Sequence, residues 1–363
     1  MTLLRGFGLY VSAGYPCVLA DVSATPMPEK ITICIAGLGR AGHFHLRSVQ
    51  SSEQFTLRYI VDPAISANEH PGGQQTKVLP TLEEALSDPA LDAVFVSTPT
   101  PYHYEHITQS LKAGKHVFAE KPLGTTVSEI QNCFDLAEEK RLALHLGFQR
   151  RCDQNFQALK KSIQEIGSVR TIKTSSRDNP QPSLDYLRIS GNIFHDMLIH
   201  DFDMLIYLLG MRVPESVYAI GYAYNQDIGD LPDFDTVLVT LKYPDGLMCA
   251  IDTSRIAVYG YDQRIELFGE KGMVIAENQR NDSVQVHTEA GMRQSPVQHS
   301  FPQRYQDAYA REVEIFGQGI LNQRFYNVTR EECLLSHIIA DAAHQSATTN
   351  SVVNVVQMYN SCV

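Results

Sequence analysis

ITICIAGLGRAG, residues 31–42 of the chain, joins a mostly apolar run to a GxGxxG turn. A strand followed by this turn and then by a helix is the arrangement that binds a dinucleotide. The first glycine makes the tight turn, the second lets the backbone approach a pyrophosphate, and the third lets the helix pack closely on the strand. The pyrophosphate then lies on the free N–H groups at the start of the helix. We therefore assign cofactor binding to Gly37, Gly39, Arg40, Ala41 and Gly42.

An acidic residue at the end of the next expected strand indicates which dinucleotide is bound. Asp62 follows Val61, twenty residues past Gly42, where a carboxylate accepts hydrogen bonds from the adenosine ribose. A carboxylate repels a 2′-phosphate, and residues 63–65 include no arginine that would neutralise one. The sequence thus favours NAD over NADP as the cofactor. The alternative is that Asp62 only initiates a turn before Pro63.

The first half of the chain alternates short apolar runs with helical stretches. The expected strands are Ile31–Ala36, Leu57–Val61, Ala93–Ser97, His116–Ala119 and Ala143–Leu146, and the expected helices lie around His43–Gln50, His103–Ala113 and Val127–Lys140. Continuously apolar strands that are joined by helices are typical of a parallel sheet covered on both faces. We predict an α/β dinucleotide-binding domain of the Rossmann type over residues 31–149.

The pattern changes after Gln149, where longer strands begin to follow one another. The expected elements are a helix at Gln154–Glu165, a strand at Ser168–Ser176, an apolar helix at Asn192–Leu209, strands at Ser216–Tyr224, Thr236–Tyr243, Leu247–Thr253, Gln263–Phe268 and Met273–Ala276, and helices at Arg304–Gly317 and Arg330–Gln345. Pro-Asp-Gly (244–246) and Glu-Lys-Gly (270–272) lie between strands as the turns of antiparallel hairpins. We predict that residues 150–363 form an α+β domain with an open, mostly antiparallel sheet.

Bulk composition narrows the class of partner. The 363 residues are 44% hydrophobic and 20% charged, with a formal net charge of −11. Such a surface repels nucleic acid and anionic lipid but not an uncharged small molecule, so we expect neither nucleic acid nor a membrane as a partner. No apolar run approaches the ~20 residues of a membrane span. Seven widely spaced cysteines without a CxxC pair indicate reduced thiols and give a zinc site little support.

Residues 1–30 precede the first expected strand as an extension. Its first twenty residues are moderately apolar, with Arg5 as their one base and no acid, which is compatible with a weak targeting peptide. Three glycines and Pro16 interrupt the apolar run, so a loosely packed extension is the favoured interpretation. The expected location of the protein is therefore the cytoplasm.

A lysine follows one strand of the first half directly, in Glu120-Lys121-Pro122. Ligands of an open α/β sheet bind beyond the carboxyl ends of its strands, so we expect Lys121 to point toward the nicotinamide end of the site. Pro122 restricts the backbone of Lys121. The alternative is an ordinary surface lysine.

The apolar helix over residues 192–209 carries the second set of chemical groups. Asp196, His200 and Asp203 are spaced at i, i+4 and i+7, so on a regular α-helix they share one face. The stretch contains no Lys, Arg, Glu or Gln, unlike a helix with a solvated face. A carboxylate one turn from an imidazole raises its basicity, and we therefore predict that His200 is a general base for an alcohol.

Two other interpretations of this helix are open. The pairs His195-Asp196 and His200-Asp201 resemble the ligand pairs of a metal-dependent phosphohydrolase, but such enzymes are wholly helical and this chain is not. We accordingly expect no metal. The remaining interpretation is a core histidine without a function.

Several segments together resemble the Gfo/Idh/MocA oxidoreductase family, and within it the inositol 2-dehydrogenases. They are GLGRAG (37–42), VSTPTPYHYEH (96–106), AGKHVFAEKP (113–122), GFQRRCDQNFQALK (147–160), GNIFHDMLIHDFDM (191–204), AVYGYDQRIELFGEKGMVIAEN (257–278) and RYQDAYARE (304–312). The resemblance covers residues 31 to about 317, and its later segments are the ones that point to inositol.

This resemblance implies an NAD-dependent dehydrogenase that oxidises a ring hydroxyl of a cyclic polyol, with myo-inositol as the leading substrate and its 2-keto inosose as the product. It implies that His200 takes the hydroxyl proton with Asp196 as its partner, and that Lys121 holds and polarises the reacting oxygen. It also implies a homodimer or homotetramer joined through the open face of the second sheet.

Further roles are carried over from the family by position. Glu120 would lie near the nicotinamide ribose, and Thr98 and Pro99 would line the cofactor channel. The residues expected to contact the substrate are Lys121, Arg151, Asp196, His200, Tyr259 and Tyr305.

Three positions depart from the pattern of the family. Asn192 replaces a usual glycine, His195 replaces a usual apolar residue, and Gln149 stands where asparagine is common. If His195 and Gln149 lie near the substrate, the alternative is a different inositol isomer or a sugar. A non-catalytic ligand sensor of the same fold is less favoured, because the chain keeps the whole catalytic group.

Overall fold

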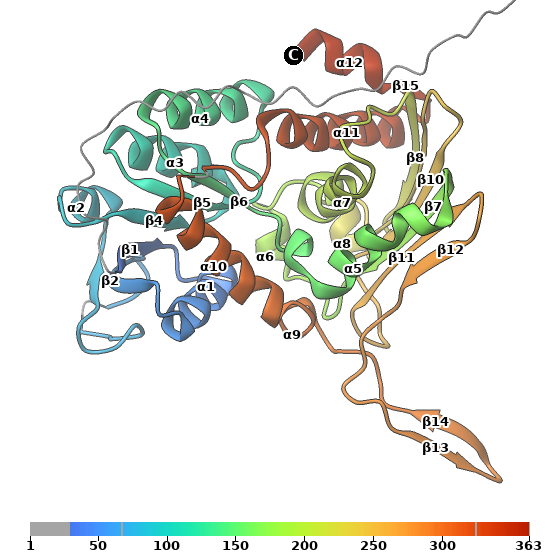
Figure 1. The fold of residues 1–363 in the computed structure, drawn as a ribbon, viewed down its shortest axis with the longest axis horizontal. Helices are drawn as coiled ribbons and strands as arrows, with labels where there is room; N and C mark the ends of the chain where they lie inside the picture. Colours follow the sequence, from blue (N-terminus) through green and yellow to red (C-terminus); the bar gives the residue numbers. More distant parts are fainter. Residues whose placement is uncertain (1–29, 67, 324, 363) are drawn as a thin grey trace, which may run out of the picture.

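Two sheets and the helices packed against them make up the fold (Figure 1). The computed structural model describes residues 30–66, 68–323 and 325–362. Apart from Lys30, the N-terminal extension and the targeting peptide considered for it lie outside the described residues. Among the described helices, none combines the length and the apolar character that crossing a bilayer requires.

The first sheet has six parallel strands in the order β3-β2-β1-β4-β5-β6. The strands are β1 (Ile31–Ala36), β2 (Phe55–Val61), β3 (Lys77–Leu79), β4 (Ala93–Val96), β5 (His116–Glu120) and β6 (Leu144–Gly147). The helices of this half are α1 (Arg40–Ser51), α2 (Leu82–Leu86), η1 (Thr100–Tyr102), α3 (His103–Lys112) and α4 (Val127–Lys140). This strand order is that of the doubly wound dinucleotide-binding fold, which confirms the predicted fold class.

The apolar residues of the central strand explain why both faces are covered. Alternate side chains of β1 point to opposite faces, so Ile33 and Ile35 pack in one core with α1. Cys34 and Ala36 belong to the other core, which includes side chains of α3 and α4. Helix α10 (Gln306–Leu321), which the sequence grouped with the second half, packs on the face of α1 and contributes Val313, Phe316 and Ile320 to that core.

The second sheet has seven strands in the order β12-β11-β7-β10-β9-β8-β15, and only β7 and β10 pair in parallel. This sheet comprises β7 (Val169–Arg177), β8 (Ser216–Tyr222), β9 (Thr236–Lys242), β10 (Met248–Ser254), β11 (Asp262–Gly269), β12 (Met273–Ala276) and β15 (Val353–Asn354). The remaining elements are η2 (Gln149–Cys152), α5 (Gln154–Ser162), η3 (Ile163–Ile166), α6 (Leu184–Leu187), η4 (Phe194–Leu198), α7 (Ile199–Leu209), α8 (Gln226–Gly229), β13 (Gln285–Thr288), β14 (Gly291–Gln294), α9 (Phe301–Arg304), α11 (Arg330–Thr349) and α12 (Val355–Cys362). The prediction of an open, mostly antiparallel second sheet is confirmed.

Helices α7 and α11 cover one face of this sheet (Figure 1). The other face carries apolar side chains that are half exposed, among them Ile220, Leu238 and Met248 at 46%, 50% and 54%. The alternation along β9, buried then exposed, is the pattern expected of a sheet covered on one face only.

Three features of the fold differ from the sequence prediction. Strand β3 has three residues and α2 has five, too few to show a period. The hairpin of β13 and β14 extends away from the sheets, and since neither strand is buried its sequence lacks the alternation that marks a strand (Figure 1). The helix predicted over residues 192–209 begins with the π-helical turn η4 and becomes α-helical only at Ile199.

Candidate active site

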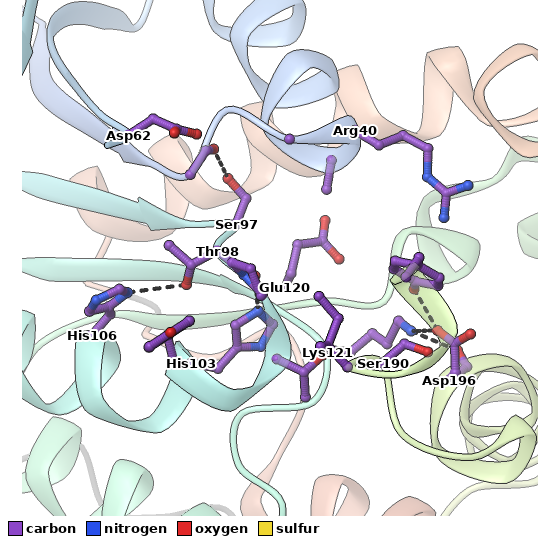
Figure 2. A pocket seen from close by; sticks show the side chains of 18 of the residues that line it. Arg40, Asp62, Ser97, Thr98, His103, His106, Glu120, Lys121, Ser190 and Asp196 are labelled. Atoms are coloured by element: carbon purple, nitrogen blue, oxygen red, sulfur yellow. Dashed lines mark hydrogen bonds and ion pairs between the residues drawn. The ribbon is translucent and has the colours of Figure 1, made fainter. Parts of the chain in front are cut away.

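A cavity of about 730 Å³ opens where the carboxyl ends of the first sheet face the helices of the second half. Figure 2 shows the lining, with Asp62 at the upper left and Lys121 and Asp196 at the lower right, and with the side chain of Arg40 on the same side as Asp196. The predicted residues that line it are Gly37, Gly39, Arg40, Ala41, Asp62, Thr98, Pro99, Glu120, Lys121, Asp196 and His200. The cofactor and catalytic groups therefore meet in one cavity, with Gly42 as the single exception.

The three glycines of the turn have distinct roles. Gly37 has φ +86°, and a Cβ there would stand 2.7 Å from the backbone of Ser97. A Cβ on Gly42 would stand 2.1 Å from the carbonyl oxygen of Gly37, so Gly42 serves helix–strand packing and does not line the cavity. A Cβ on Gly39 would meet no described atom within 4 Å. Gly39 caps α1 without a side-chain cap from any described residue, which leaves the first N–H groups of the helix to bind a pyrophosphate.

Asp62 is fixed by the backbone on both sides. Its Oδ2 accepts a hydrogen bond from Leu38 N–H at 2.8 Å, and its Oδ1 accepts one from Ala64 N–H at 2.9 Å. Asp62 thus begins the turn before Pro63 and also lines the cavity, so the turn does not exclude a contact with ribose, which stays a prediction. A carboxylate has about four acceptor positions, and two are left for ribose hydroxyls. Together with the open glycine turn, this donor and acceptor set fits NAD.

The loops after β4 and β5 are held together by a buried histidine. The two ring nitrogens of His103 lie 2.7 Å from the carbonyl oxygens of Thr98 and Pro122. Glu120 accepts a hydrogen bond from His45 Nε2 at 2.7 Å. Burial alone would raise the pKa of Glu120, but the hydrogen bond and charge of His45 and the charge of Lys121 lower it below its ordinary value. Glu120 therefore enters the cavity as a carboxylate.

Lys121 reaches across from the first sheet to the π-helical turn. Its Nζ donates a hydrogen bond to the carbonyl oxygen of Asp196 at 2.6 Å and lies 3.2 Å from Asp196 Oδ1. The Lys121 side chain keeps 14% of its surface exposed, toward the cavity it lines. The alternative of an ordinary surface lysine is therefore wrong.

Asp196 is the centre of a buried charge network. Its Oδ1 accepts a hydrogen bond from the Tyr186 hydroxyl at 2.7 Å, and its Oδ2 accepts one from Arg255 Nη1 at 2.9 Å. Arg255 is fully buried and also pairs with Asp233 at 2.7 Å. Burial works to raise the pKa of Asp196, but the charges of Lys121 and Arg255 and the two hydrogen bonds lower it to about 2. Asp196 is therefore fully ionised at neutral pH.

His200 is not paired with Asp196, and this part of the prediction is wrong. The partners of Asp196 are Lys121, Tyr186 and Arg255, and His200 Nδ1 has no hydrogen-bond partner among the described residues. Burial, followed by the positive charges of Lys121 and Arg150, lowers the pKa of His200 well below its ordinary value. The imidazole is thus neutral at pH 7, which is the state that accepts a proton, although no carboxylate raises its basicity.

Asp203, the third residue of the predicted stripe, does not line the cavity. The π-helical turn shifts the register of Asp196 against the residues of α7, but His200 and Asp203 both lie in α7 and keep their α-helical spacing. Asp203 is fully buried and binds Arg151 with both oxygens, at 2.6 to 3.1 Å, away from the cavity.

Three residues expected to contact the substrate do not line the cavity. Arg151 is held by Asp203 and by Glu332, the latter at 3.0 Å. Tyr259 is 49% exposed and donates its hydroxyl hydrogen to Asp262. Tyr305 is fully buried beneath the cavity wall, with its ring 5.9 Å from that of Tyr261.

Near neighbours of these residues line the cavity instead. Arg150, next to Arg151, lies 3.2 Å from Asp201 and donates a hydrogen bond to Ser176 at 3.1 Å. The other such residues are Gln149, Asp178, Tyr261, Phe301 and Tyr309. Burial and the negative charge of Asp196 raise the pKa of Asp178 to about 6. The sequence offered a signal for Gln149, which departs from the pattern of the family, and for Asp178, which directly follows strand β7.

The metal-ligand set considered for this helix is not assembled. Asp196 belongs to the lysine and arginine network, whereas Asp201 pairs with Arg150 and is fully buried. His195 does not line the cavity, so of the two departures expected near the substrate only Gln149 is there.

A Rossmann sheet with an open glycine turn, a carboxylate at the end of β2, and a lysine and a neutral histidine in one cavity is the arrangement of an NAD-dependent oxidoreductase. Family models agree with this class: "Oxidoreductase family, NAD-binding Rossmann fold" matches residues 31–148, and "Oxidoreductase family, C-terminal alpha/beta domain" matches residues 160–355. The chain belongs to the Gfo/Idh/MocA family of oxidoreductases, as its resemblance indicated.

Relatives that are named for an activity are similar to this chain over most of their length. The chain is 36% identical to myo-inositol 2-dehydrogenase of Thermotoga maritima, over 86% of this chain and 95% of that protein. It is 35% identical to inositol 2-dehydrogenase of Rhizobium meliloti, over 88% and 98%. A scyllo-inositol dehydrogenase of Lactobacillus casei, solved with bound NAD(H) and scyllo-inositol, superposes with a TM-score of 0.83 at 27% identity, over 90% of this chain and 99% of that one.

Proposed function

We propose that this oxidoreductase removes a hydride from a ring carbon of a cyclic polyol and a proton from the hydroxyl on that carbon, with myo-inositol as the first candidate and its 2-keto inosose as the product. The names of the relatives support a polyol, since both myo- and scyllo-inositol dehydrogenases are among them. The cavity supports an uncharged, hydroxyl-rich substrate, because its inner end presents both donors and acceptors.

The residues of the chain divide the work of this reaction. The ammonium group of Lys121 donates to the reacting oxygen and stabilises negative charge that develops on it. Neutral His200 accepts the hydroxyl proton, a step that needs an imidazole without its second proton. NAD, when bound, supplies the acceptor for the hydride. The carbon–oxygen bond becomes a carbonyl, and the proton leaves through His200.

Asp196 serves this chemistry by positioning Lys121 rather than by touching His200. Two contacts, from Nζ to the backbone and to the carboxylate of the same residue, fix the lysine at the end of its flexible stem. Holding a catalytic group in place before the reaction lowers the entropic part of the barrier.

The observation that carries this proposal is the meeting of Lys121 and His200, from opposite halves of the chain, in the cavity that also holds the glycine turn. The direct experiment measures NADH formation by the purified full-length protein with myo-inositol, scyllo-inositol and a panel of monosaccharides, with NADP in parallel. Turnover of an inositol with NAD is the expected result. If a monosaccharide turns over and both inositols are inert, the polyol assignment is wrong while the dehydrogenase chemistry stands.

The choice between inositol isomers has a specific residue behind it. Gln149 lines the cavity, and it stands where asparagine is common in the family. Gln149 carries its amide one methylene farther from the backbone than asparagine would, and scyllo-inositol is the second candidate because scyllo-inositol dehydrogenases are among the relatives. Comparing kcat/KM for the two isomers before and after Gln149→Asn tests whether this residue sets the preference.

We also propose that the half-exposed apolar face of the second sheet is a contact between copies of the chain, giving a homodimer or homotetramer. The side chains involved would include Ile220, Leu238, Met248 and Phe268, which are 43% to 54% exposed. Contiguous exposed apolar patches of this kind are typical of interaction sites. Light scattering with size-exclusion chromatography tests it: Leu238→Asp should dissociate the assembly, whereas Val284→Asp on the protruding segment should not.

A further inference from the structure

Three side chains that could ligate a metal ion lie together behind the active-site helix, outside the cavity. His195 comes from η4, and His337 and Asp341 come from α11. One candidate ligand atom from each lies within 4.8 Å of the others. The rings of the two histidines are 5.0 Å apart, and the three side chains are 16%, 2% and 41% exposed respectively. The cluster is thus buried on one side and open to solvent on the other.

The hydrogen bonds of His195 fix which ring nitrogen carries its proton. Asn192 Oδ1 accepts hydrogen bonds from the backbone N–H groups of Phe194 at 3.0 Å and His195 at 3.2 Å, so this atom is the amide oxygen. It also lies 3.0 Å from His195 Nδ1, which must therefore be the donor. In the neutral ring, Nε2 is then left with a lone pair.

That lone pair points at a carboxylate. His195 Nε2 lies 2.9 Å from Asp341 Oδ1, and an ionised carboxylate oxygen can only accept hydrogen bonds. Two acceptors at this distance are held together either by a second proton on the ring or by a cation between them. A histidine that donates one N–H to a protein oxygen and presents its other nitrogen is the usual arrangement of a metal ligand.

His337 provides the second, independent sign. It is 2% exposed, and its Nδ1 has no hydrogen-bond partner in the described chain. Its Nε2 lies 3.6 Å from Asp341 Oδ2, beyond a normal hydrogen bond. A buried imidazole without a partner is unfavourable, and a bound ion would satisfy one of its nitrogens.

We infer that His195, His337 and Asp341 bind a divalent transition-metal ion, with Zn²⁺ as the best match to two imidazoles and one carboxylate. Three protein ligands and one water complete a tetrahedral zinc shell, and the open side of the cluster provides the water and the entry path. Ligands about 2.0–2.1 Å from a tetrahedral ion lie about 3.3 Å apart, so the observed spacing needs only small side-chain shifts.

An ion here would join the active-site helix to α11. His195 immediately precedes Asp196, whose carbonyl and carboxylate hold Lys121. Zinc would therefore clamp the π-helical turn from the side opposite the cavity without entering the reaction. This inference is independent of the proposed substrate, since the metal can bind whether or not a polyol does.

Zinc binding to the full-length protein, prepared without a histidine tag, tests this inference. At pH 7.5 we expect about one tightly bound Zn²⁺ per chain by isothermal titration and by metal analysis after dialysis. We expect Co²⁺ to give the visible absorption of a tetrahedral site, and Zn²⁺ to raise the melting temperature. His195→Gln and Asp341→Asn should each weaken zinc binding at least about tenfold and abolish the rise in melting temperature, as loss of a ligand does more than the 10–100-fold loss of an outer-shell partner.

His344→Gln is the matched control, because it removes an imidazole from the same helix three residues beyond Asp341. It should leave zinc binding unchanged. Equal zinc binding by the wild type and by Asp341→Asn would overturn the site. Absence of stoichiometric zinc in the wild type would overturn it too, and would assign the contact of His195 with Asp341 to a protonated imidazole. Asp341 is 41% exposed, so its asparagine variant is expected to fold.

Discussion

The two ends of the cavity are formed by different kinds of chemical group: mainly backbone groups at the cofactor end, and charged side chains at the substrate end. At the cofactor end, the glycine turn and the start of α1 present backbone groups, and Asp62 is held by two backbone N–H groups. At the substrate end, the side chains are fixed by a network of buried ion pairs. It runs from Lys121 through Asp196 and Arg255 to Asp233.

Because of this difference, we expect mutations at the two ends of the cavity to have different effects. A backbone site depends on space and on φ angles, so it is damaged where a side chain is added. A buried charge network depends on every partner, because removing one leaves another charge without compensation. Changes at the substrate end should therefore affect stability and turnover together, and changes at the cofactor end should mainly affect affinity.

The largest effect is expected for His200→Ala. Loss of a general base lowers turnover by about 10²–10⁴. NADH affinity, measured by fluorescence titration, should stay within about twofold, since His200 belongs to the substrate end. His344→Gln, which removes a histidine away from the cavity, is the control for both readouts. If His200→Ala lowered NADH affinity as much as it lowers turnover, the two ends of the cavity would not act independently.

Arg255→Met should give the largest loss of stability. Its removal leaves Asp196 and Asp233 buried without their shared cation, and breaking a buried ion pair costs about 3–5 kcal/mol. Urea unfolding of the variant measures the change. As a control, Arg188→Met breaks an exposed pair with Asp185 and should cost less than about 1 kcal/mol. If the two variants lost similar free energies of unfolding, the buried network around Arg255 would not stabilise the fold more than an exposed ion pair does.

The same contrast explains what the sequence could reveal. Gly37, Gly39 and Asp62 could be placed in the cavity because a tight turn, a close backbone approach and the end of a strand each demand a residue type at a fixed position. Five of the six strands of the first sheet followed for the same reason, since continuously apolar strands separated by helices have few other solutions, whereas β3 is too short to be recognised.

Which side chains reach the substrate end depends on the local backbone geometry, and the identities of neighbouring residues do not reveal that geometry. Arg150 and Arg151 are adjacent and chemically identical, and the 3₁₀ turn η2 alone decides that Arg150 lines the cavity. Asp203 likewise pairs with Arg151 outside the cavity, a contact that the spacing of residues along the helix does not reveal. Arg255 and Asp233 lie more than thirty residues along the chain from Asp196, so a contact between them could not be inferred from one sequence.

Asp62→Ala should have a smaller effect, confined to cofactor binding. The loss of hydrogen bonds from a charged acceptor costs about 1.5–3 kcal/mol each, or about tenfold or more in NAD affinity. NADP should lose less or gain, because the repulsion of its 2′-phosphate disappears. Titration of each dinucleotide by fluorescence gives the two ratios. An equal loss for NAD and NADP would show that Asp62 acts only on the turn through Pro63.

The smallest expected effect is a pH dependence at the substrate end. Burial and the charge of Asp196 raise the pKa of Asp178 to about 6, so its carboxylate is ionised at neutral pH and gains a proton as the pH falls through 6. At one unit below its pKa a carboxyl group is about nine-tenths protonated and has lost the charged acceptor that binds a hydroxyl. KM for the polyol should therefore rise several-fold between pH 7 and pH 5, while NADH affinity stays level. Burial and the charges of Lys121 and Arg150 hold the pKa of His200 well below its ordinary value, so this ring gains its proton at a lower pH than a free imidazole does. Asp178→Asn keeps the shape of the side chain and removes its charge, so it should raise KM at pH 7 and make KM independent of pH between 5 and 7. If KM of this variant still rises as the pH falls, another group is responsible for the titration.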